Sequence, residues 1–333
     1  MTLRIGVLGA ARIAPSAIVK PARAIEGAEV VAVAARDEAK ARGFAAKHGI
    51  PTVHQSYDAL IADPDVDAIY NPLPNGLHGA WTVRALEAGK HVLCEKPFTA
   101  NAAEAREVAA VADAARERGT VTMEAFHWRY HPLATRLLDL VNGGDLGRLE
   151  RVEAVMLAPL LRSSDIRWQL ALAGGSMMDM GCYPASFART MAQAEPEVTH
   201  AEARLRSPGI DRYLRAELRF PNGATGRITC GMLSAPGIGL SARMRFERGD
   251  VRVLNPFAPQ YFCRLSVRGP TGRKREKVVR TPTYNFQLEA FVDAVRDHTE
   301  PVTGTAFAIA NMELVDACYR AAGLEPRTPT PVA

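Results

Sequence analysis

Short apolar runs that alternate with helical segments most constrain the first 126 residues of this 333-residue chain. Turn residues separate the two kinds of segment, as at Pro72–Gly76. Strands that alternate with helices form a parallel sheet with helices on both faces, so we expect a doubly wound α/β domain. Strands are expected at Leu3–Leu8, Val30–Ala34, from Val53, and at Val66–Asn71, His91–Cys94 and Val121–Ala125.

The pattern changes after about residue 126, where runs of strands replace the alternation. A helix is expected at Pro132–Asn142, a strand at Leu149–Met156 and a helix near Met177–Gln193. Hairpin-type turns then separate successive strands. These strands are expected near His200–Arg206, Tyr213–Phe220, Thr225–Met232, Ser241–Phe246, Val251–Leu254, Tyr261–Val267 and Lys277–Arg280, with final helices at Asn285–His298 and Ala306–Ala321. We therefore predict two domains: residues 1–126, and an α+β domain 127–333 with an open-faced, mostly antiparallel sheet and helices on one face.

Charge and cysteine usage exclude several classes of protein. The net charge is +5, but the single basic cluster, Arg273-Lys274-Arg275, is typical of a solvated turn rather than a nucleic-acid surface. The five cysteines are widely spaced and lack a CxxC pair, which argues against disulfides and a zinc site. No apolar run approaches membrane-spanning length, and the N-terminal stretch has no basic leader. We expect a cytoplasmic protein that binds no metal, nucleic acid or membrane.

The strand His91–Cys94 ends in Glu95-Lys96-Pro97. Ligands bind at the carboxyl ends of strands in parallel sheets, and Pro97 has no N–H with which to continue the ladder. Lys96 is therefore expected to deliver an ammonium group to that crevice. The alternative is a strand cap whose charges are solvated.

The first strand is followed by a degraded dinucleotide fingerprint. Gly9, Ala11 and Ala14 occupy the positions of the three glycines in G-x-G-x-x-G, and the alternative is an ordinary turn. The second strand ends in Ala35-Arg36, where NAD-selective proteins usually hold an acid. Arg36 suits the 2′-phosphate of NADP, although it can also be surface charge, and Asp37 is interpreted as a helix N-cap.

Two further segments combine polar and aromatic residues. In Gly174–Pro184, Asp179 and Tyr183 share one face if helical, and Pro184 forces a kink or a fresh helix start. The alternative is a capping box at Ser176-x-x-Asp179 with Tyr183 in the core. The segment Met123–Pro132 places aromatic and basic side chains at the domain junction, where they suit a polyhydroxylated substrate or interdomain packing.

Together these motifs resemble the Gfo/Idh/MocA oxidoreductase family, and the resemblance covers essentially the whole chain. The family implies an N-terminal Rossmann domain, an open-faced C-terminal sheet, NAD(P), and oxidation or reduction of sugars and related alcohols. Many members carry His where this chain has Tyr183; the Tyr form resembles the glucose-fructose oxidoreductase and dihydrodiol dehydrogenase branch, which favours NADP. The matching residues are Val7–Ala14, Pro72–Asn75 with His78, Gly89–Pro97, Trp128-Arg129, Gly174-Gly175, Asp179-x-Gly181-x-Tyr183, Tyr284-x-x-Gln287-Leu-Glu-Ala-Phe291 and Asp316–Tyr319.

The motifs, together with what the family resemblance implies, give a set of expected site residues. Lys96, Tyr183 and Asp179 are the expected catalytic residues. The cofactor, NADP with NAD as an alternative, is expected to contact Gly9, Ala10, Ala11, Arg12, Ile13, Arg36, Pro72, Leu73, Asn75, His78, Glu95, Lys96, Trp128 and Arg129. A small-molecule substrate, a sugar or diol, is expected to contact Lys96, Phe126, Trp128, Arg167, Asp179 and Tyr183.

The expected chemistry is hydride transfer with a separate route for the proton. A free tyrosine has a pKa of about 10, and a nearby Lys96 ammonium would lower the pKa of Tyr183 by favouring the phenolate. Asp179 would orient Lys96 or hold a substrate hydroxyl. Two alternatives are a glycoside hydrolase with transient dinucleotide oxidation and an idle NADP-binding sensor.

The C-terminal sheet is also expected to join subunits into a homodimer or homotetramer. It has about seven strands but few helices to cover both faces. Strands such as Thr225–Met232 and Ser241–Phe246 carry apolar residues at mixed parity, which would leave apolar side chains on the open face.

Overall fold

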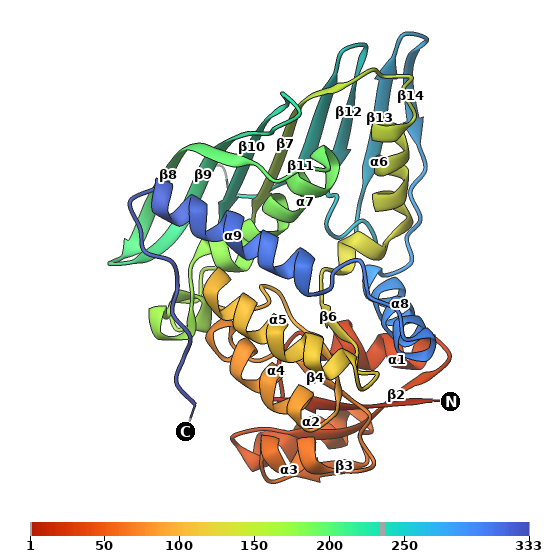
Figure 1. Ribbon diagram of the computed structural model, residues 1–333, viewed down its shortest axis with the longest axis vertical. Helices are drawn as coiled ribbons and strands as arrows, with labels where there is room; N and C mark the ends of the chain where they lie inside the picture. The colour runs from red at the N-terminus through yellow and green to blue at the C-terminus, as the bar shows by residue number, and fades with distance from the viewer. Residues whose placement is uncertain (1, 234–236, 333) are drawn as a thin grey trace. The chain divides into compact units, whose positions relative to one another are not determined.

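The computed structural model describes residues 2–233 and 237–332, which form two compact units (Figure 1). The first unit comprises residues up to 127 together with 284–309 and the segment from 329. The second comprises 128–283 and 310–328. The first change of unit thus falls next to the boundary expected from sequence, whereas two later segments return to the first unit. The assignment of cofactor binding to residues 1–126 and of substrate binding and assembly to 127–333 stays a prediction.

The first unit contains a parallel six-stranded sheet in the order β3-β2-β1-β4-β5-β6. The apolar runs became strands because both faces of the sheet are covered, and all four residues of β4 are buried. The strands are β1 Leu3–Leu8, β2 Ala28–Ala34, β3 Thr52–His54, β4 Ala68–Asn71, β5 His91–Cys94 and β6 Thr122–Glu124. The predicted doubly wound sheet is confirmed.

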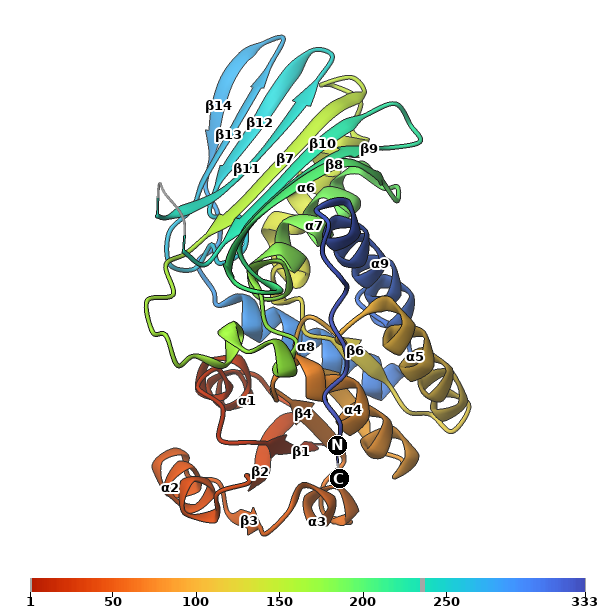
Figure 2. The ribbon, with the colours of Figure 1, turned by 90° about the vertical axis from the view of Figure 1, so that its left-hand side faces the viewer.

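Helices cover both faces of this sheet, with α1 and α2 on one side of the strands and α4 and α5 on the other (Figure 2). Local signals fix their ends: Asp37 accepts the N–H of Lys40, which confirms it as an N-cap, and Gly49 ends α2 at φ +62°. The helices are α1 Lys20–Ala24 after a π-helical turn Pro15–Val19, α2 Glu38–His48, α3 Tyr57–Ala62, α4 His78–Glu87, α5 Ala102–Arg116 and α8 Thr283–Asp297.

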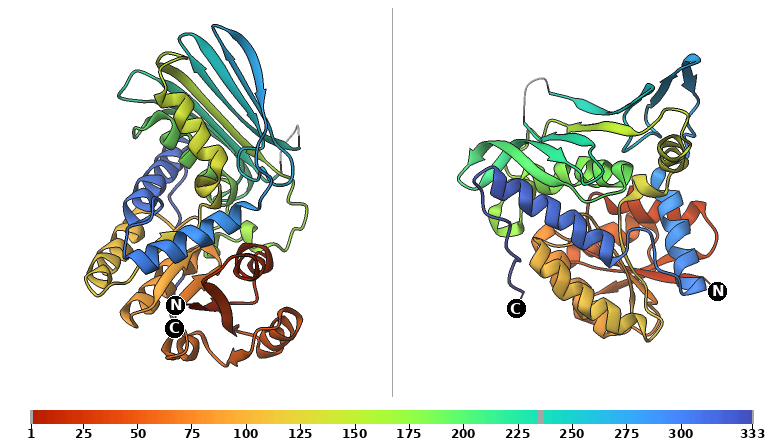
Figure 3. Two further views of the ribbon diagram at one scale, coloured as in Figure 1. Left: turned by 90° about the vertical axis from the view of Figure 1, so that its right-hand side faces the viewer. Right: turned by 45° about the horizontal axis from the view of Figure 1, so that its top comes forward.

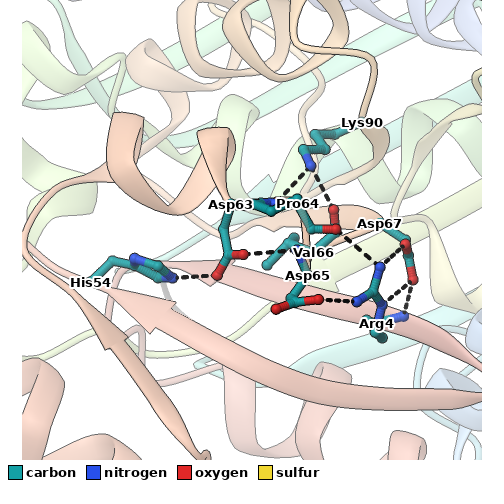
Figure 4. A network of polar contacts seen from close by, with 8 residues as sticks. All are labelled: Arg4, His54, Asp63, Pro64, Asp65, Val66, Asp67 and Lys90. Carbon is teal, nitrogen blue, oxygen red and sulfur yellow. Dashed lines mark hydrogen bonds and ion pairs between the residues drawn. The ribbon is translucent and has the colours of Figure 1, made fainter.

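A polar network fastens the α3–β4 loop, residues 63–67, near the amino-terminal ends of the strands (Figure 4). The guanidinium of Arg4 donates to Asp67 at 2.8 and 3.0 Å. The ammonium of Lys90 donates to the carbonyls of Asp63 and Val66, each at 2.7 Å. Cationic side chains therefore satisfy main-chain carbonyls of this loop. The network lies at the opposite end of the strands from their carboxyl ends.

The late segments join the first unit through hydrogen bonds to its strands and loops. Thr303 accepts the N–H of Glu124 on its carbonyl, and its hydroxyl donates back to the Glu124 carbonyl. The N–H of Thr330 donates to the Gly76 carbonyl at 2.7 Å. These contacts explain why the first unit is not continuous in sequence.

The second unit contains an eight-stranded sheet in the order β14-β13-β12-β11-β7-β10-β9-β8. Among the described strands of this sheet, only β7 and β10 pair in parallel, so the predicted mostly antiparallel sheet is confirmed. The helices of this unit lie on one face of the sheet (Figure 3). The elements are β7 Leu149–Leu157, β8 Glu197–Ser207, β9 Ile210–Arg219, β10 Thr225–Gly231, β11 Gly239–Phe246, β12 Gly249–Leu254, β13 Arg264–Gly269, β14 Gly272–Glu276, α6 Pro132–Asn142, α7 Cys182–Ala192 after a π-helical segment Met177–Gly181, and α9 Thr305–Ala321, which begins in the first unit.

Two expectations for this sheet were wrong. A strand was expected at Lys277–Arg280, but residues 277–280 have no regular structure. The last strand is instead β14, which pairs with β13 through a hairpin that closes at Gly269 and Gly272. The basic cluster is therefore an exposed edge strand and not a turn. The apolar residues of β11 do not have mixed parity: Ala242, Met244 and Phe246 are buried. The polar residues Ser241, Arg243 and Arg245 alternate with them.

Glu104 supplies a pH-dependent contribution to the stability of the first unit. Its carboxylate accepts the Ala100 N–H at 2.7 Å and lies against Gly79, where any side chain would collide with it. Burial raises the pKa of Glu104 to about 7. An acid whose folded-state pKa is raised favours folding when protonated, so this contribution is lost as pH rises from about 4.5 to about 7.

We expect Glu104→Gln, which keeps an acceptor oxygen, to match the wild type near about pH 4 and to be more stable at about pH 8 by about 1–3 kcal/mol. Denaturant unfolding at the two pH values measures this difference. Glu117→Gln, an exposed change at the end of the same helix, is the control and should show no such dependence. Equal stability of Glu104→Gln and wild type at pH 8 would contradict the assignment.

Candidate active site

The carboxyl ends of β1, β2, β4 and β5 bring four sequence motifs to one edge of the first unit. The strand order reverses between β1 and β4, which are neighbours in the sheet, and ligands of such folds bind at this switch point. The strands β1, β4 and β5 are directly followed by Gly9, Pro72 and Glu95, respectively. Arg36 lies two residues after the end of β2. The motifs expected to bind the cofactor are therefore adjacent in the fold.

The turn after β1 requires its glycine. Gly9 has φ +90°, which L-residues rarely adopt, and a Cβ there would lie 3.3 Å from the Leu73 side chain. Its N–H donates to the Ala34 carbonyl at 2.6 Å, which fixes the turn against β2. The following residues, Ala10 to Ile13, are exposed or half-buried and form an open turn before the π-helical turn. This close, small-residue approach fits a dinucleotide at the edge of the sheet.

Arg36 is available to an anion. Its side chain is exposed, and among residues 2–233 and 237–332 it pairs with no carboxylate. Asp37 does not neutralise it, because that carboxylate caps α2 and pairs with Lys40 at 3.3 Å. The turn after β2 therefore presents an uncompensated guanidinium, which suits a 2′-phosphate.

His78 joins the loop after β4 to the loop after β5. Its Nδ1 lies 2.7 Å from the Pro97 carbonyl and its Nε2 lies 2.7 Å from the Leu73 carbonyl. Burial lowers the pKa of His78 to about 4, although the two carbonyls favour the charged ring. Because both ring nitrogens face the main chain, His78 connects these two loops and has no ring nitrogen turned toward a ligand. The peptide bond between Lys96 and Pro97 is cis.

Buried polar residues at the strand ends support Lys96. Glu95 accepts the hydroxyl of Tyr70 at 2.8 Å and the Lys96 N–H at 3.3 Å. At the end of β6, Glu124 accepts the Phe98 N–H at 2.8 Å. At the end of β4, Asn71 donates to the His78 carbonyl at 3.0 Å. Sequence reasoning missed Tyr70, Asn71 and Glu124, although the last two carry a usable signal: each is a polar residue that ends a buried strand.

The second unit holds Asp179 with Arg167. Arg167 Nε lies 2.8 Å from Asp179 Oδ1, and Arg167 Nη1 donates to Asp165 Oδ1 at 3.1 Å. The expected alternative, a capping box at Ser176, is wrong: Ser176 already has helical dihedral angles and makes no capping bond. Its hydroxyl donates instead to Asp211 at 2.7 Å, which frees Asp179 for the ion pair with Arg167.

A buried charge pair, Asp211–Arg327, organises the Gly174-Gly175 turn. The two side chains are 2.7 Å apart and almost fully buried. Asp211 also accepts the Met177 N–H at 2.7 Å, and Arg327 Nε donates to the Gly174 carbonyl at 2.6 Å. Gly175 has φ +131°, and a side chain there would collide with Asp211 and Arg327. Sequence reasoning missed both charged residues, because nothing local in the sequence links them to the turn.

Tyr183 follows the π-helical segment, at the second residue of α7. Ser186 donates to the Tyr183 carbonyl at 2.8 Å and accepts the indole N–H of Trp128 at 3.2 Å. The Tyr183 ring packs on Phe257 at 5.5 Å and is 5 % exposed. Trp128 is 1 % exposed, and it supports Tyr183 indirectly, through its hydrogen bond to Ser186.

Arg129 is a second cation that suits an anionic ligand. It is half-buried, and in the described part of the chain it contacts no carboxylate. Burial lowers the pKa of Arg129, which is the expected effect on a cation without a counter-ion. Phe126, in the first unit, is fully buried and packs edge-to-face on Phe307 at 5.7 Å.

The expected site residues thus fall into two groups, each of which lies within one unit. That they meet around one cofactor and substrate stays a prediction. The first unit holds Gly9, Ala10, Ala11, Arg12, Ile13, Arg36, Pro72, Leu73, Asn75, His78, Glu95, Lys96 and Phe126, and the second holds Trp128, Arg129, Arg167, Asp179 and Tyr183. Among the described residues, no group of three acids, histidines or cysteines could hold a metal ion, and no helix could cross a membrane. The five cysteines are free.

Comparison with known proteins identifies the family. Residues 3–125 match the model of an oxidoreductase family with an NAD-binding Rossmann fold, GFO_IDH_MocA, and residues 135–252 match the C-terminal domain of the same family. The chain belongs to the Gfo/Idh/MocA oxidoreductases. It is therefore an enzyme of the dehydrogenase and reductase type.

Three relatives illustrate the range of the family. The chain is 36 % identical to D-xylose 1-dehydrogenase (NADP(+)) 2 of Haloferax volcanii, over 95 % of this chain and 96 % of the relative. It is 37 % identical to trans-1,2-dihydrobenzene-1,2-diol dehydrogenase of Sus scrofa, over 68 % and 67 %. The structure of KijD10, a 3-ketoreductase from Actinomadura kijaniata in complex with NADP and TDP-benzene, is similar at a TM-score of 0.89 and 30 % identity, over 96 % and 98 %.

Proposed function

We propose that this protein is an NADP-dependent oxidoreductase that transfers hydride between nicotinamide and a carbonyl or hydroxyl carbon of a sugar, a sugar derivative or a cyclic diol. The observation that carries the proposal is the support built around Lys96 and Tyr183 in a chain of this family. Glu95 and Glu124 fix the loop that carries Lys96, and Ser186 and Trp128 fix the start of the helix that carries Tyr183. No described contact favours a glycoside hydrolase or a sensor.

The cofactor fits the carboxyl edge of the first unit. The turn Gly9–Ile13 would approach the pyrophosphate, and Arg36 would receive the 2′-phosphate. Pro72, Leu73, Asn75 and His78 would shape the loop beside the nicotinamide, and Arg129 would add a cation. When bound, the nicotinamide supplies the hydride chemistry, and the protein supplies orientation and a proton route. NADP selectivity follows from Arg36, because its guanidinium has no carboxylate partner in the described chain.

Lys96, Tyr183 and Asp179 would handle the proton. In this arrangement the Tyr183 hydroxyl exchanges a proton with the substrate oxygen as hydride moves. The Lys96 ammonium favours the phenolate, and thus lowers the pKa of Tyr183 toward neutrality. Asp179 is held by Arg167 and is therefore a fixed anion that orients the substrate or Lys96. Phe126 and Trp128 are buried, so they would shape the substrate site from behind.

The partners are a small-molecule substrate and further copies of the same chain, in a cytoplasmic enzyme. The open face of the eight-stranded sheet carries a hollow of about 400 Å³, which is lined by Val155, Leu254, Arg243 and Arg264 among others. In the described part of the chain, Arg243 and Arg264 contact no carboxylate, so their donors are available to a second copy. A homodimer or homotetramer through this face would cover both the hollow and these cations.

Arg36→Ala should weaken NADP(H) binding far more than NAD(H) binding, by about 1–3 kcal/mol for lost charge-assisted hydrogen bonds. Nucleotide fluorescence titrations measure both affinities. Arg42→Ala, a change on α2 that removes an arginine paired with Glu38, is the matched control and should leave the preference unchanged. Tighter binding of NADH than of NADPH by the wild type would refute the assignment.

Tyr183→Phe keeps the ring and removes the acidic hydroxyl, so turnover of a verified substrate should fall about 10²–10⁴-fold. Lys96→Met should be at least as damaging, because it removes the charge that makes the phenolate accessible. Neither change should greatly weaken NADP(H) binding. Steady-state kinetics with parallel cofactor titrations test this pair, and near-wild-type turnover of Tyr183→Phe would exclude the mechanism.

Light scattering at micromolar concentration should find a dimer or a tetramer. Leu254 pairs across strands with Arg264, so Leu254→Arg places like charges side by side and should shift the protein toward monomer. Val302→Arg, at an exposed position of the first unit, is the control. A monomeric wild type would argue against assembly through this face.

A further inference from the structure

The face of the eight-stranded sheet that is turned away from the helices of its unit has two halves of different charge (Figure 3). On β8–β10 the arginines pair mostly with glutamates, as in Arg227–Glu217 at 2.6 Å and Arg215–Glu202 at 3.5 Å. On β11–β14, the strand register places seven arginines on this face but one acid, Asp250, among the described residues. The seven are Arg243, Arg245, Arg252, Arg264, Arg268, Arg273 and Arg275.

Some of these arginines lie directly opposite one another. Arg243 is paired in register with Arg252, and Arg268 with Arg273. Like charges in opposite positions destabilise a sheet. Charges on an edge strand are explained as protection against aggregation, but Arg243 and Arg252 lie on β11 and β12, inside the sheet. A solvated face does not require the imbalance either, because β8–β10 carry mixed charges.

These arginines border the hollow of about 400 Å³ on this face. Its volume lies within the range of about 300–1,000 Å³ that is typical of small-molecule sites. Glu153 is the one acid among its described lining residues, and it is already 2.9 Å from Arg151. The hollow therefore has an excess of positive charge. The lining arginines are Arg243, Arg252, Arg264 and Arg273.

The sheet itself holds two of the lining guanidinium groups. Arg252 Nε donates to Asp250 at 2.8 Å, and Arg273 Nε donates to the buried Ser266 hydroxyl at 2.8 Å. Within residues 2–233 and 237–332, the terminal amino groups of these two arginines donate to no acceptor. Side chains that are already placed lose less conformational freedom when they bind a ligand. Their amino groups are therefore available to a molecule in the hollow.

This arrangement suits phosphate groups. A guanidinium presents parallel N–H donors that match two oxygens of one phosphate, and the opposite charges strengthen both hydrogen bonds. Several guanidinium groups around one hollow are offset best by an anion that carries several charges. A neutral sugar would leave the like charges of Arg243 and Arg252 uncompensated.

We propose that the hollow lined by Arg243, Arg252, Arg264 and Arg273 is a binding site for a small multivalent anion that carries phosphate groups. The site is separate from every residue assigned to the cofactor or the substrate. One consequence rests on the proposed function, which joins copies of the chain through this face. A symmetric interface brings the same patch of two subunits together, so bound anions would offset the arginines that meet there.

Calorimetry tests the site with two probes, inorganic diphosphate and fructose 1,6-bisphosphate. The protein is saturated with NADPH, and the titrations use a phosphate-free buffer at constant ionic strength, so that general screening does not change. We expect saturable binding of at least one probe. Arg243→Gln and Arg264→Gln should each weaken it at least about tenfold, the scale of a lost charged hydrogen bond. Tighter binding of the diphosphate supports an inorganic ligand, and tighter binding of the bisphosphate supports a phosphate ester.

Arg215→Gln is the matched control, because it removes an arginine of the same face that is paired with Glu202, and it should leave the affinity unchanged. Absence of saturable binding overturns the inference, as does equal affinity of the wild type and both hollow variants. In light scattering, the tighter probe should lower the protein concentration at which the wild type associates, but not that for Arg243→Gln. If the wild type binds the probe in the hollow and stays monomeric, the proposed assembly fails and the anion site stands.

Discussion

The site of the second unit depends on the buried ion pair between Asp211 and Arg327. Asp211 orders the first turn of the helical segment by accepting from Ser176 and Met177, and Arg327 holds the Gly174 carbonyl. The Tyr319 hydroxyl adds a third donor to Asp211 at 3.0 Å, and the Arg327 guanidinium stacks on that ring. A buried pair with this many supporting bonds has its desolvation offset, whereas a lone buried charge costs about 3–5 kcal/mol. The pair therefore fixes the start of the segment that carries Asp179 and Tyr183.

The two units position their functional groups by different means. In the first unit, Asn71, Glu95 and Glu124 lie at or directly after the ends of parallel strands, and their hydrogen bonds of 2.8–3.3 Å fix the loops that follow. In the second unit, a π-helical segment leads into α7, and the change of helix type falls between Asp179 and Tyr183. Segments of this kind are frequent at functional sites because they displace a side chain from its helical register. Pro184 is the third residue of α7 and has no N–H, so it makes no main-chain hydrogen bond back into the π-helical segment.

Most of the fold could be predicted from sequence, because the spacing of the apolar residues and the capping and turn residues indicate the same helices and strands. Asp37 was expected to be a helix N-cap, and it accepts the N–H of Lys40 at the start of α2. The end of the second sheet could not be placed, because the run Gly272–Glu276 is polar and its pairing with β13 decides its structure. The ion pairs Asp179–Arg167 and Asp211–Arg327 could also not be predicted from the sequence. Their partners lie 12 and 116 residues apart, and the side-chain geometry that pairs them is tertiary.

The Asp211–Arg327 pair also bears on the order in which the chain can mature. Arg327 follows Gly174 by 153 residues, and the Gly174-Gly175 turn closes on it. While the protein is being synthesised, Asp211 emerges from the ribosome well before its partner. Until then it is a carboxylate at the edge of an unfinished core, and the segment that carries Tyr183 has no fixed start. Partly made chains thus carry the segment from Asp179 to Tyr183 without the arginine that holds the turn before it.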